Sequence, residues 1–229
     1  YKNFHWVMKN RPDLVEPCVT TLQVDGQTSH VLAVIPPEQM RRVLSCVWNP
    51  AEFRSDYGLR SLSKFHEKNP VQYESSTVRY EPAEALEKLK GGNSNWRGPI
   101  WLPTSFMMIE SLRKLRKAYG ESFTVPDLGR AGSSLPADGA HGVTRPTAEV
   151  TLEEMAHGFS NRLIQMFGRD AQDRRAIHGT SKKFQTDPHW RDLPLFHEYF
   201  HGDTGEGLGA SHQTGWTALV ASLIDEWRK

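Results

Sequence analysis

Amphipathic helices separated by long irregular stretches constrain this chain more than any other feature. Pro36 and Pro37 open the first helix, and Pro50 ends it. Its apolar side chains fall at i, i+3, i+4, i+7 and i+8, at Met40, Val43, Leu44, Val47 and Trp48. Further helices are predicted at about 104–119, 151–167 and 213–227. The pattern predicts an all-α architecture with few strands, whose loops gather at one end.

The remaining segments are predicted to be short or irregular. Residues 21–35 form an extended pair around Asp25-Gly26, and residues 71–80 are extended in part. Residues 82–90 form a short polar helix. Residues 121–150 are rich in Gly, Pro and Ser, which indicates a loop insertion at the surface.

Composition excludes several classes of protein. The 28 basic and 27 acidic residues leave a net charge of +1 without a basic stripe, so a nucleic-acid partner is not expected. No apolar run approaches the roughly 18 residues of a membrane helix. Cys18 and Cys46 define no disulfide framework, which favours a cytoplasmic location. The chain starts at Tyr1 rather than Met, so it is expected to begin within a longer protein or after processing. Its first residues show no signal-peptide pattern.

Residues 194–216 combine three histidines, two glutamates, an aspartate and a glutamine with aromatic and glycine residues. Dense polar groups on a glycine-rich, non-repetitive loop indicate a functional site. Glu198 lies where an aromatic segment ends, so neighbouring rings can partly desolvate its carboxylate while it still reaches a bound water. That setting suits a general base. The alternative is an ordinary ion pair between Glu198 and a neighbouring His or Arg.

The same residues also fit the zinc motif H-E-x-x-H. On a helix, His197 and His201 would face one way and hold zinc, with Glu198 as the general base. Four glycines follow His201 within eight residues, and they would end such a helix at once. The site is therefore interpreted as a carboxylate site without metal or cofactor, and the zinc-dependent hydrolase remains an alternative.

Residues 91–103 form a second informative stretch. Asn95, Trp96, Arg97 and Trp101 lie there among Gly and Pro, just before a predicted helix. Aromatic faces cover the apolar faces of sugars while polar groups bind the hydroxyls, so these residues are a candidate sugar-binding rim. The two tryptophans could instead be core anchors.

Three stretches together resemble the C-terminal part of glycoside hydrolase family 63, which includes processing α-glucosidase I and bacterial glucosidases. They are residues 93–101 (NSNWRGPIW), 187–192 (DPHWRD) and 196–216, which begins FHEYFHGD and ends HQTGW. The resemblance implies half of an (α/α)6 toroid and inverting hydrolysis of an α-glucosidic bond. In that chemistry one carboxylic acid protonates the leaving oxygen and a second carboxylate activates water, the two being about 6.5–9.5 Å apart.

The same resemblance implies roles for individual residues. Glu198 would be the general base, and Trp96 and Trp101 would line the sugar pocket. Gln213 would bind sugar hydroxyls or orient the water. Further candidate substrate-binding residues are Asn95, Arg97 and His212.

The family's general acid is an Asp that would fall before Tyr1. Residues 1–229 are therefore expected to be the C-terminal portion of one catalytic domain. Their expected partners are an α-glucoside or oligosaccharide and the missing N-terminal half, and the chain alone is expected to be inactive. A non-catalytic carbohydrate-binding fragment is the remaining alternative.

Overall fold

The computed structural model describes residues 2–16, 19–24, 26–33, 35–86, 95–129 and 148–227. The helices are α1 (Lys2–Asn10), α2 (Pro12–Val15), α3 (Pro37–Trp48), α4 (Leu102–Tyr119), α5 (Leu152–Phe167), α6 (Lys182–Thr186), α7 (Thr214–Thr217) and α8 (Leu219–Trp227), with 3-10 helices η1 (Lys64–Glu67) and η2 (Ala176–His178). The strands are β1 (Val19–Val24), β2 (Gln27–Leu32), β3 (Arg54–Ser55), β4 (Gly58–Leu59), β5 (Val71–Tyr73), β6 (Ser76–Val78), β7 (Thr124–Pro126), β8 (Glu149–Thr151), β9 (Tyr199–Phe200) and β10 (Gly207–Leu208).

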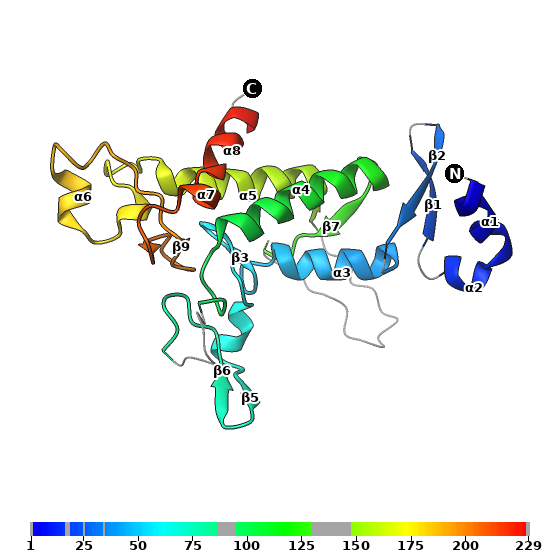
Figure 1. Cartoon of the computed structure of the whole chain (residues 1–229), viewed down its shortest axis with the longest axis horizontal. Coiled ribbons are helices and arrows are strands. Elements are labelled where there is room, and N and C mark those ends of the chain that lie inside the picture. Colours follow the sequence, from blue (N-terminus) through cyan, green and yellow to red (C-terminus); the bar gives the residue numbers. More distant parts are fainter. Residues whose placement is uncertain are drawn as a thin grey trace.

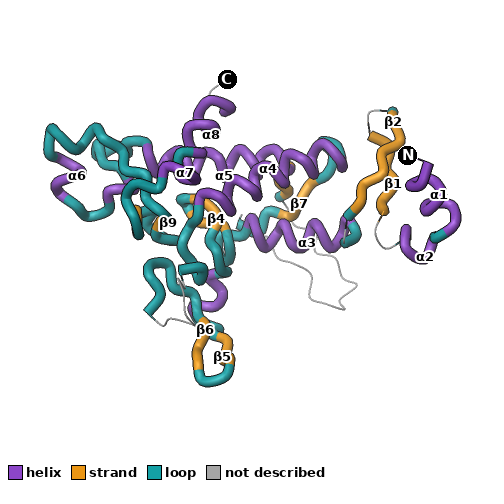
Figure 2. The backbone as a smooth tube through the Cα atoms, viewed as in Figure 1, coloured by secondary structure: helices purple, strands orange, loops and turns teal. Residues whose placement is uncertain are grey.

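The molecule is elongated, with helices α3, α4 and α5 along its middle (Figure 1). Helices α1 and α2 and the β1–β2 hairpin lie at one end, and α6 lies at the other. The β5–β6 hairpin projects from one side, and α8 projects from the opposite side (Figure 1). Loops cover much of the end that carries α6, α7 and β9 (Figure 2).

Helices α4 and α5 form the centre of the hydrophobic core. Thr151 caps α5 by accepting a hydrogen bond from the Glu154 backbone N–H, and the Glu154 side chain accepts from the Thr151 N–H. The inward residues of α5 follow helical spacing: Leu152, Met155, Ala156, Phe159, Leu163 and Met166 are each at most 1% exposed. Ile109 and Leu112 of α4 are fully buried in the same core. Burial of this stripe supplies the main stabilisation of the helix pair.

The predicted helices are confirmed with small shifts. Helix α3 starts at Pro37 and ends before Pro50, as predicted, although Val43 is 51% exposed and lies outside the buried stripe. The segment predicted as one helix over 213–227 is divided into α7 and α8 at Ala218.

The prediction of an all-α fold is wrong, because the described chain is a mixture of helices and small sheets. Five two-stranded antiparallel sheets pair β1 with β2, β3 with β4, β5 with β6, β7 with β8, and β9 with β10. The (α/α)6 toroid is therefore unsupported. Most of these strands have only two or three residues, too few to show the period-two alternation by which strands are recognised. Pairing them satisfies backbone groups in what the sequence presents as loops.

Other local predictions have mixed outcomes. The hairpin around residues 25–26 is confirmed as β1–β2, and Gly26 adopts the positive φ of +76° that its turn requires. Residues 82–86 are not helical, and residues 87–90 of that predicted helix lie outside the described residues. Most of the predicted insertion, residues 130–147, also lies outside them. Within the described ranges, no helix is both long and apolar enough to cross a membrane.

Candidate functional site

Glu198 lies immediately before β9 and is fixed through its backbone. Its N–H donates to the Ala210 carbonyl at 2.8 Å, and its own carbonyl accepts from the Trp216 indole Nε1–H at 2.8 Å. Next along the strand, Phe200 exchanges backbone hydrogen bonds with Ile100, at 2.8 and 2.9 Å. These contacts hold the backbone of Glu198 against the segment that leads into α4.

The Glu198 side chain is half-buried and has a neutral hydrogen-bond partner. Its Oε2 accepts from the Ala210 backbone N–H at 3.3 Å. A Cβ at Gly209, where φ is +68°, would lie 2.8 Å from the same oxygen, so glycine permits this close approach. Among the described residues, Glu198 has no ion pair, and the predicted alternative of an ordinary pair with a neighbouring His or Arg is not observed. The carboxylate therefore remains available to another donor.

Three aromatic rings stack beside β9. The rings of Trp96 and Trp101 are 4.0 Å apart and almost parallel, and Tyr199 stacks on Trp101 at 4.8 Å. Trp101 is 2% exposed whereas Trp96 is 46% exposed. The stack therefore has a buried centre, Trp101, and presents Trp96 at the surface.

Asn95 holds this stack together. Its backbone carbonyl accepts from the Trp101 Nε1–H at 2.8 Å, and its side-chain Nδ2 donates to the Tyr199 hydroxyl at 2.7 Å. Its Oδ1 accepts from the Ala85 backbone N–H at 2.8 Å. The Tyr199 hydroxyl in turn donates to Glu84 Oε1 at 3.3 Å. Burial, followed by the charge of Glu84, raises the pKa of Tyr199 to about 12, so Tyr199 is a neutral donor near neutral pH.

Glu84 was missed by the sequence analysis. It lies in the segment predicted as a polar helix, eleven residues before Asn95 and outside the three family-like stretches. A single glutamate in a charged segment carries no pattern that would distinguish it. The contact with Tyr199 depends on how two distant segments meet.

Arg97 is buried and engaged. Its guanidinium pairs with Glu81 at 2.6 Å, and only 7% of the residue is exposed. The Glu81 N–H donates to the Arg97 carbonyl at 2.6 Å. Arg97 therefore ties its own loop to the segment that carries Glu84.

Gln213 and His212 lie where the loop enters α7. The Gln213 backbone N–H donates to the Phe196 carbonyl at 2.6 Å, and its side-chain oxygen accepts from the Gly215 N–H at 3.2 Å. His212 is exposed and forms a parallel bridge with Phe196. These contacts with Phe196 hold both residues next to the segment 196–198.

The geometry required by the zinc alternative is not found. His197 and His201 flank the extended strand β9, whereas the motif needs them one turn apart on a helix. The His201 Nδ1 accepts from the Asp203 N–H at 3.1 Å. Burial, followed by the charge of His212, lowers the pKa of His197. In the part of the chain that the structure describes, no three His, Cys, Asp or Glu side chains could together hold a metal ion.

Asp203 anchors the loop between β9 and β10. It pairs with Arg60 and with Lys64, each at 3.0 Å, and accepts from the Tyr80 hydroxyl at 3.1 Å. Burial alone would raise the pKa of Asp203, but the hydrogen bonds from Lys64 and Arg60 outweigh it and lower the pKa below its ordinary value. The acidic side chain at the end of the FHEYFHGD stretch is thus a structural anchor.

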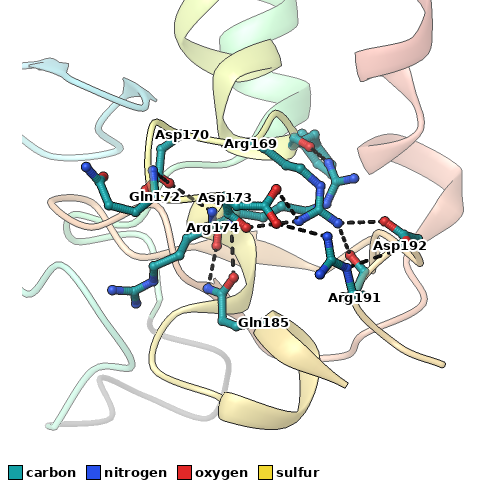
Figure 3. Close-up of polar contacts among 10 residues, drawn as sticks. Arg169, Asp170, Gln172, Asp173, Arg174, Gln185, Arg191 and Asp192 are labelled. Atoms are coloured by element: carbon teal, nitrogen blue, oxygen red, sulfur yellow. Dashed lines mark hydrogen bonds and ion pairs between the residues drawn. The ribbon is translucent and has the colours of Figure 1, made fainter. Parts of the chain in front are cut away.

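Figure 3 shows that the second family-like stretch, residues 187–192, is held by a network of charged side chains. Arg169 pairs with Asp173 at 2.9 Å and Asp192 at 2.6 Å, and Arg191 pairs with Asp173 at 2.9 Å. Gln185 accepts from the Arg175 N–H at 3.0 Å, closing the same loop from the other side. The network fixes the irregular segment that leads from α5 to Glu198.

Comparison with known proteins supports the carbohydrate chemistry. The family model described as the mannosylglycerate hydrolase MGH1-like glycoside hydrolase domain matches residues 5–217. The uncharacterized protein YMR196W of Saccharomyces cerevisiae is 40% identical over 98% of this chain. A probable mannosyl-oligosaccharide glucosidase of Schizosaccharomyces pombe and the mannosyl-oligosaccharide glucosidase of Saccharomyces cerevisiae are each 22% identical, over 86% and 84% of this chain.

The chain covers 20%, 17% and 16% of the length of these three relatives. The two glucosidases support the coarser part of the family resemblance, a glycoside hydrolase with distant similarity to enzymes of that kind. The match to the family model extends over both the Trp96 and the Glu198 stretches. The chain therefore belongs to the mannosylglycerate hydrolase MGH1-like glycoside hydrolase family.

Proposed function

We propose that this chain supplies the general base and part of the sugar pocket of an inverting glycosidase that acts on α-glycosidic bonds, α-glucosides first among them. The observation that carries the proposal is the Glu198 carboxylate, which is positioned by backbone contacts and hydrogen-bonded only to a neutral N–H among the described residues. A carboxylate without a competing cation can accept a proton from water. Family membership supports the reaction class.

In this reaction a water molecule attacks the anomeric carbon from the face opposite the leaving group. Glu198 accepts a proton from that water as the new C–O bond forms. The glycosidic C–O bond breaks, and a second carboxylic acid protonates the leaving oxygen, so the product has the inverted configuration. We propose that this acid is an Asp in the polypeptide outside residues 1–229, which is consistent with the small share of each relative that this chain covers. On this proposal the chain would form the C-terminal part of a family 63-like catalytic unit.

The remaining candidate residues would contribute in three ways. The exposed face of Trp96 would cover the C–H face of a sugar, and Trp101 would support it from beneath. Gln213 and His212, held next to the 196–198 segment, would bind hydroxyls or orient the water. Asn95 and Arg97 would act through other residues, because their side chains are engaged with Tyr199 and Glu81.

The substrate is proposed at the level of class. The family name refers to mannosylglycerate, and the names of two relatives refer to mannosyl-oligosaccharides. An α-glucoside, a mannosyl-oligosaccharide that ends in glucose and a glycosylglycerate all present an α-linked hexose to an aromatic face. A substrate panel should therefore include all three.

The test compares wild type with Glu198→Gln in the complete natural polypeptide that contains this chain. We expect kcat to fall by about 10²- to 10⁴-fold, as for loss of a general base, with little change in KM or melting temperature. Glu67→Gln, an exposed glutamate of η1 remote in sequence from the site, is the matched control and should behave as wild type. Undiminished turnover in Glu198→Gln would contradict the proposal, as would sugar binding by wild type without any turnover.

A further inference from the structure

An unassigned carboxylate, Glu84, lies at the edge of the aromatic stack. It is exposed, and it accepts a hydrogen bond on Oε1 from the Tyr199 hydroxyl at 3.3 Å. No ion pair involves Glu84 among the residues that the structure describes. The side chain of an exposed glutamate usually samples many rotamers in the solvent. The Glu84 side chain differs, because a buried tyrosine hydroxyl holds it.

Asn95 places Glu84 and Trp96 in fixed relation to each other. Its side-chain oxygen binds the backbone N–H of Ala85, the residue after Glu84, at 2.8 Å. Its side-chain nitrogen binds the Tyr199 hydroxyl at 2.7 Å, and Trp96 is the next residue in the chain. One asparagine therefore links the segment that carries the carboxylate to the loop that carries the exposed ring.

Tyr199 also connects Glu84 to Glu198. The Tyr199 hydroxyl donates to Glu84 Oε1 at 3.3 Å, and a Cβ at Gly209 would lie 2.8 Å from both Glu198 Oε2 and Tyr199 Cε1, so each carboxylate lies beside Tyr199. Glu198 is the residue before Tyr199, and the Tyr199 ring stacks on Trp101 beneath Trp96. Two carboxylates therefore lie beside the aromatic stack: that of Glu198, the proposed base, and that of Glu84.

Glu84 has the chemistry of a hydroxyl acceptor. A carboxylate has two oxygens and about four lone-pair sites, and Tyr199 occupies one of them on Oε1. The other sites are open to solvent and could accept hydrogen bonds from adjacent hydroxyls of a sugar. Sugar sites pair an aromatic face with a few placed polar groups that fix orientation, and Trp96 and Glu84 supply one of each.

We propose that Glu84 binds hydroxyl groups of the hexose that lies on Trp96, and that Tyr199 and Asn95 are positioning residues for it. This inference rests on the proposed function and extends it, since it assigns a specificity-determining residue to the same sugar site. Glu84 accepts hydrogen bonds in this role, and the catalytic proton transfers remain with Glu198 and the second acid.

The test measures equilibrium binding of methyl α-D-glucopyranoside, methyl α-D-mannopyranoside and their monodeoxy derivatives by calorimetry, using the complete natural polypeptide. Four proteins are compared: wild type, Glu84→Gln, Glu198→Gln and the control Glu67→Gln. Losing a hydrogen bond to a charged acceptor should weaken the preferred glycoside by about 10-fold or more in Glu84→Gln. Glu198→Gln should change binding far less while lowering kcat by about 10²- to 10⁴-fold.

The deoxy series separates contact from structural support. In wild type, removing the hydroxyl that Glu84 binds should weaken affinity, and in Glu84→Gln the same removal should have little further effect. Tyr199→Phe, which removes the positioning hydroxyl, should give an intermediate loss. A uniform loss of affinity across all derivatives in Glu84→Gln, or no loss at all, would overturn the inference while leaving the proposed function intact. Absence of both binding and turnover in wild type would instead overturn the proposed function.

Discussion

The loop around Arg169 and the loops around Glu198 are both rich in charged residues, yet their charges are satisfied differently. Arg169 and Arg191 share Asp173 and Asp192, so each of these four side chains has an opposite charge as its partner (Figure 3). Glu198 and Glu84 are bound by neutral donors, an amide N–H and a phenol. Paired charges hold a loop in place. A positioned carboxylate without a paired cation can still accept a proton, or a hydrogen bond from a hydroxyl group.

The two tryptophans of the aromatic stack also differ from each other, in how far each is buried. Trp101 is buried and donates to Asn95, and Trp96 is half-exposed above it. Although the sequence presents them as equivalent members of one motif, only Trp96 has a face that a ligand could reach. Burial therefore separates Trp101, a structural residue, from Trp96, the proposed binding residue.

Replacing the two tryptophans in turn gives the largest expected difference. Trp101→Ala should lower the free energy of unfolding by about 3–5 kcal/mol, because it removes a large buried side chain. Trp96→Ala should change it by less than about 1 kcal/mol but weaken binding of methyl α-D-glucopyranoside. Urea unfolding and calorimetry measure the two effects. Similar loss of stability in both variants would remove the distinction between them.

Asp203 tests whether charge pairing in the β9–β10 loop is structural. Asp203→Asn should lower the free energy of unfolding by about 2–3 kcal/mol near neutral pH, because Arg60 and Lys64 lose a charged partner. The conservative change keeps the shape and leaves Glu198 in place. A stability equal to that of wild type at neutral pH would show that the ion pairs contribute nothing net.

The stability difference between wild type and Asp203→Asn should depend on pH. The folded pKa of Asp203 lies below its ordinary value of about 3.9. Its stabilisation is therefore complete above that value and is lost as pH falls through the folded pKa. Urea unfolding between about pH 2 and 7 should show the two proteins converging at the acid end. A constant difference across this range would contradict the assignment.

Arg191→Ala should have the smallest effect. Its partners Asp173 and Asp192 are well exposed, with side chains 58% and 69% accessible, so solvent weakens each pair. A loss of about 0.2–1 kcal/mol is expected, and it should shrink at high salt. Thermal unfolding at low and high salt measures this effect. A large, salt-independent loss would show that the network does more than hold an exposed loop.

The sequence predicted the elements with long periodic patterns. The apolar spacing of α3, α4 and α5 and the capping box at Thr151 were sufficient to place these helices. The short strands were not predicted, because two or three residues carry no period and their pairing depends on distant segments. The all-α expectation failed for that reason.

The candidate site divides in a similar way. Family-like motifs singled out Glu198 and Trp96. In the structure, the Glu198 carboxylate accepts from a backbone N–H and the Trp96 ring is half-exposed. Motif membership could not show that Arg97 is paired with Glu81, because burial and partner choice are properties of the folded chain. Glu84 lay in no motif, and its contact with Tyr199 joins residues 115 positions apart.

The most direct test of the central claim is the configuration of the first-formed product. Proton NMR during early turnover of an α-glycoside by the complete natural polypeptide would follow the anomeric signal, with Glu198→Gln as the control. The account predicts that the β anomer appears first and that the signal is lost in Glu198→Gln, since water activated by Glu198 attacks opposite the leaving group. Initial release of the α anomer, or undiminished turnover in Glu198→Gln, would contradict it.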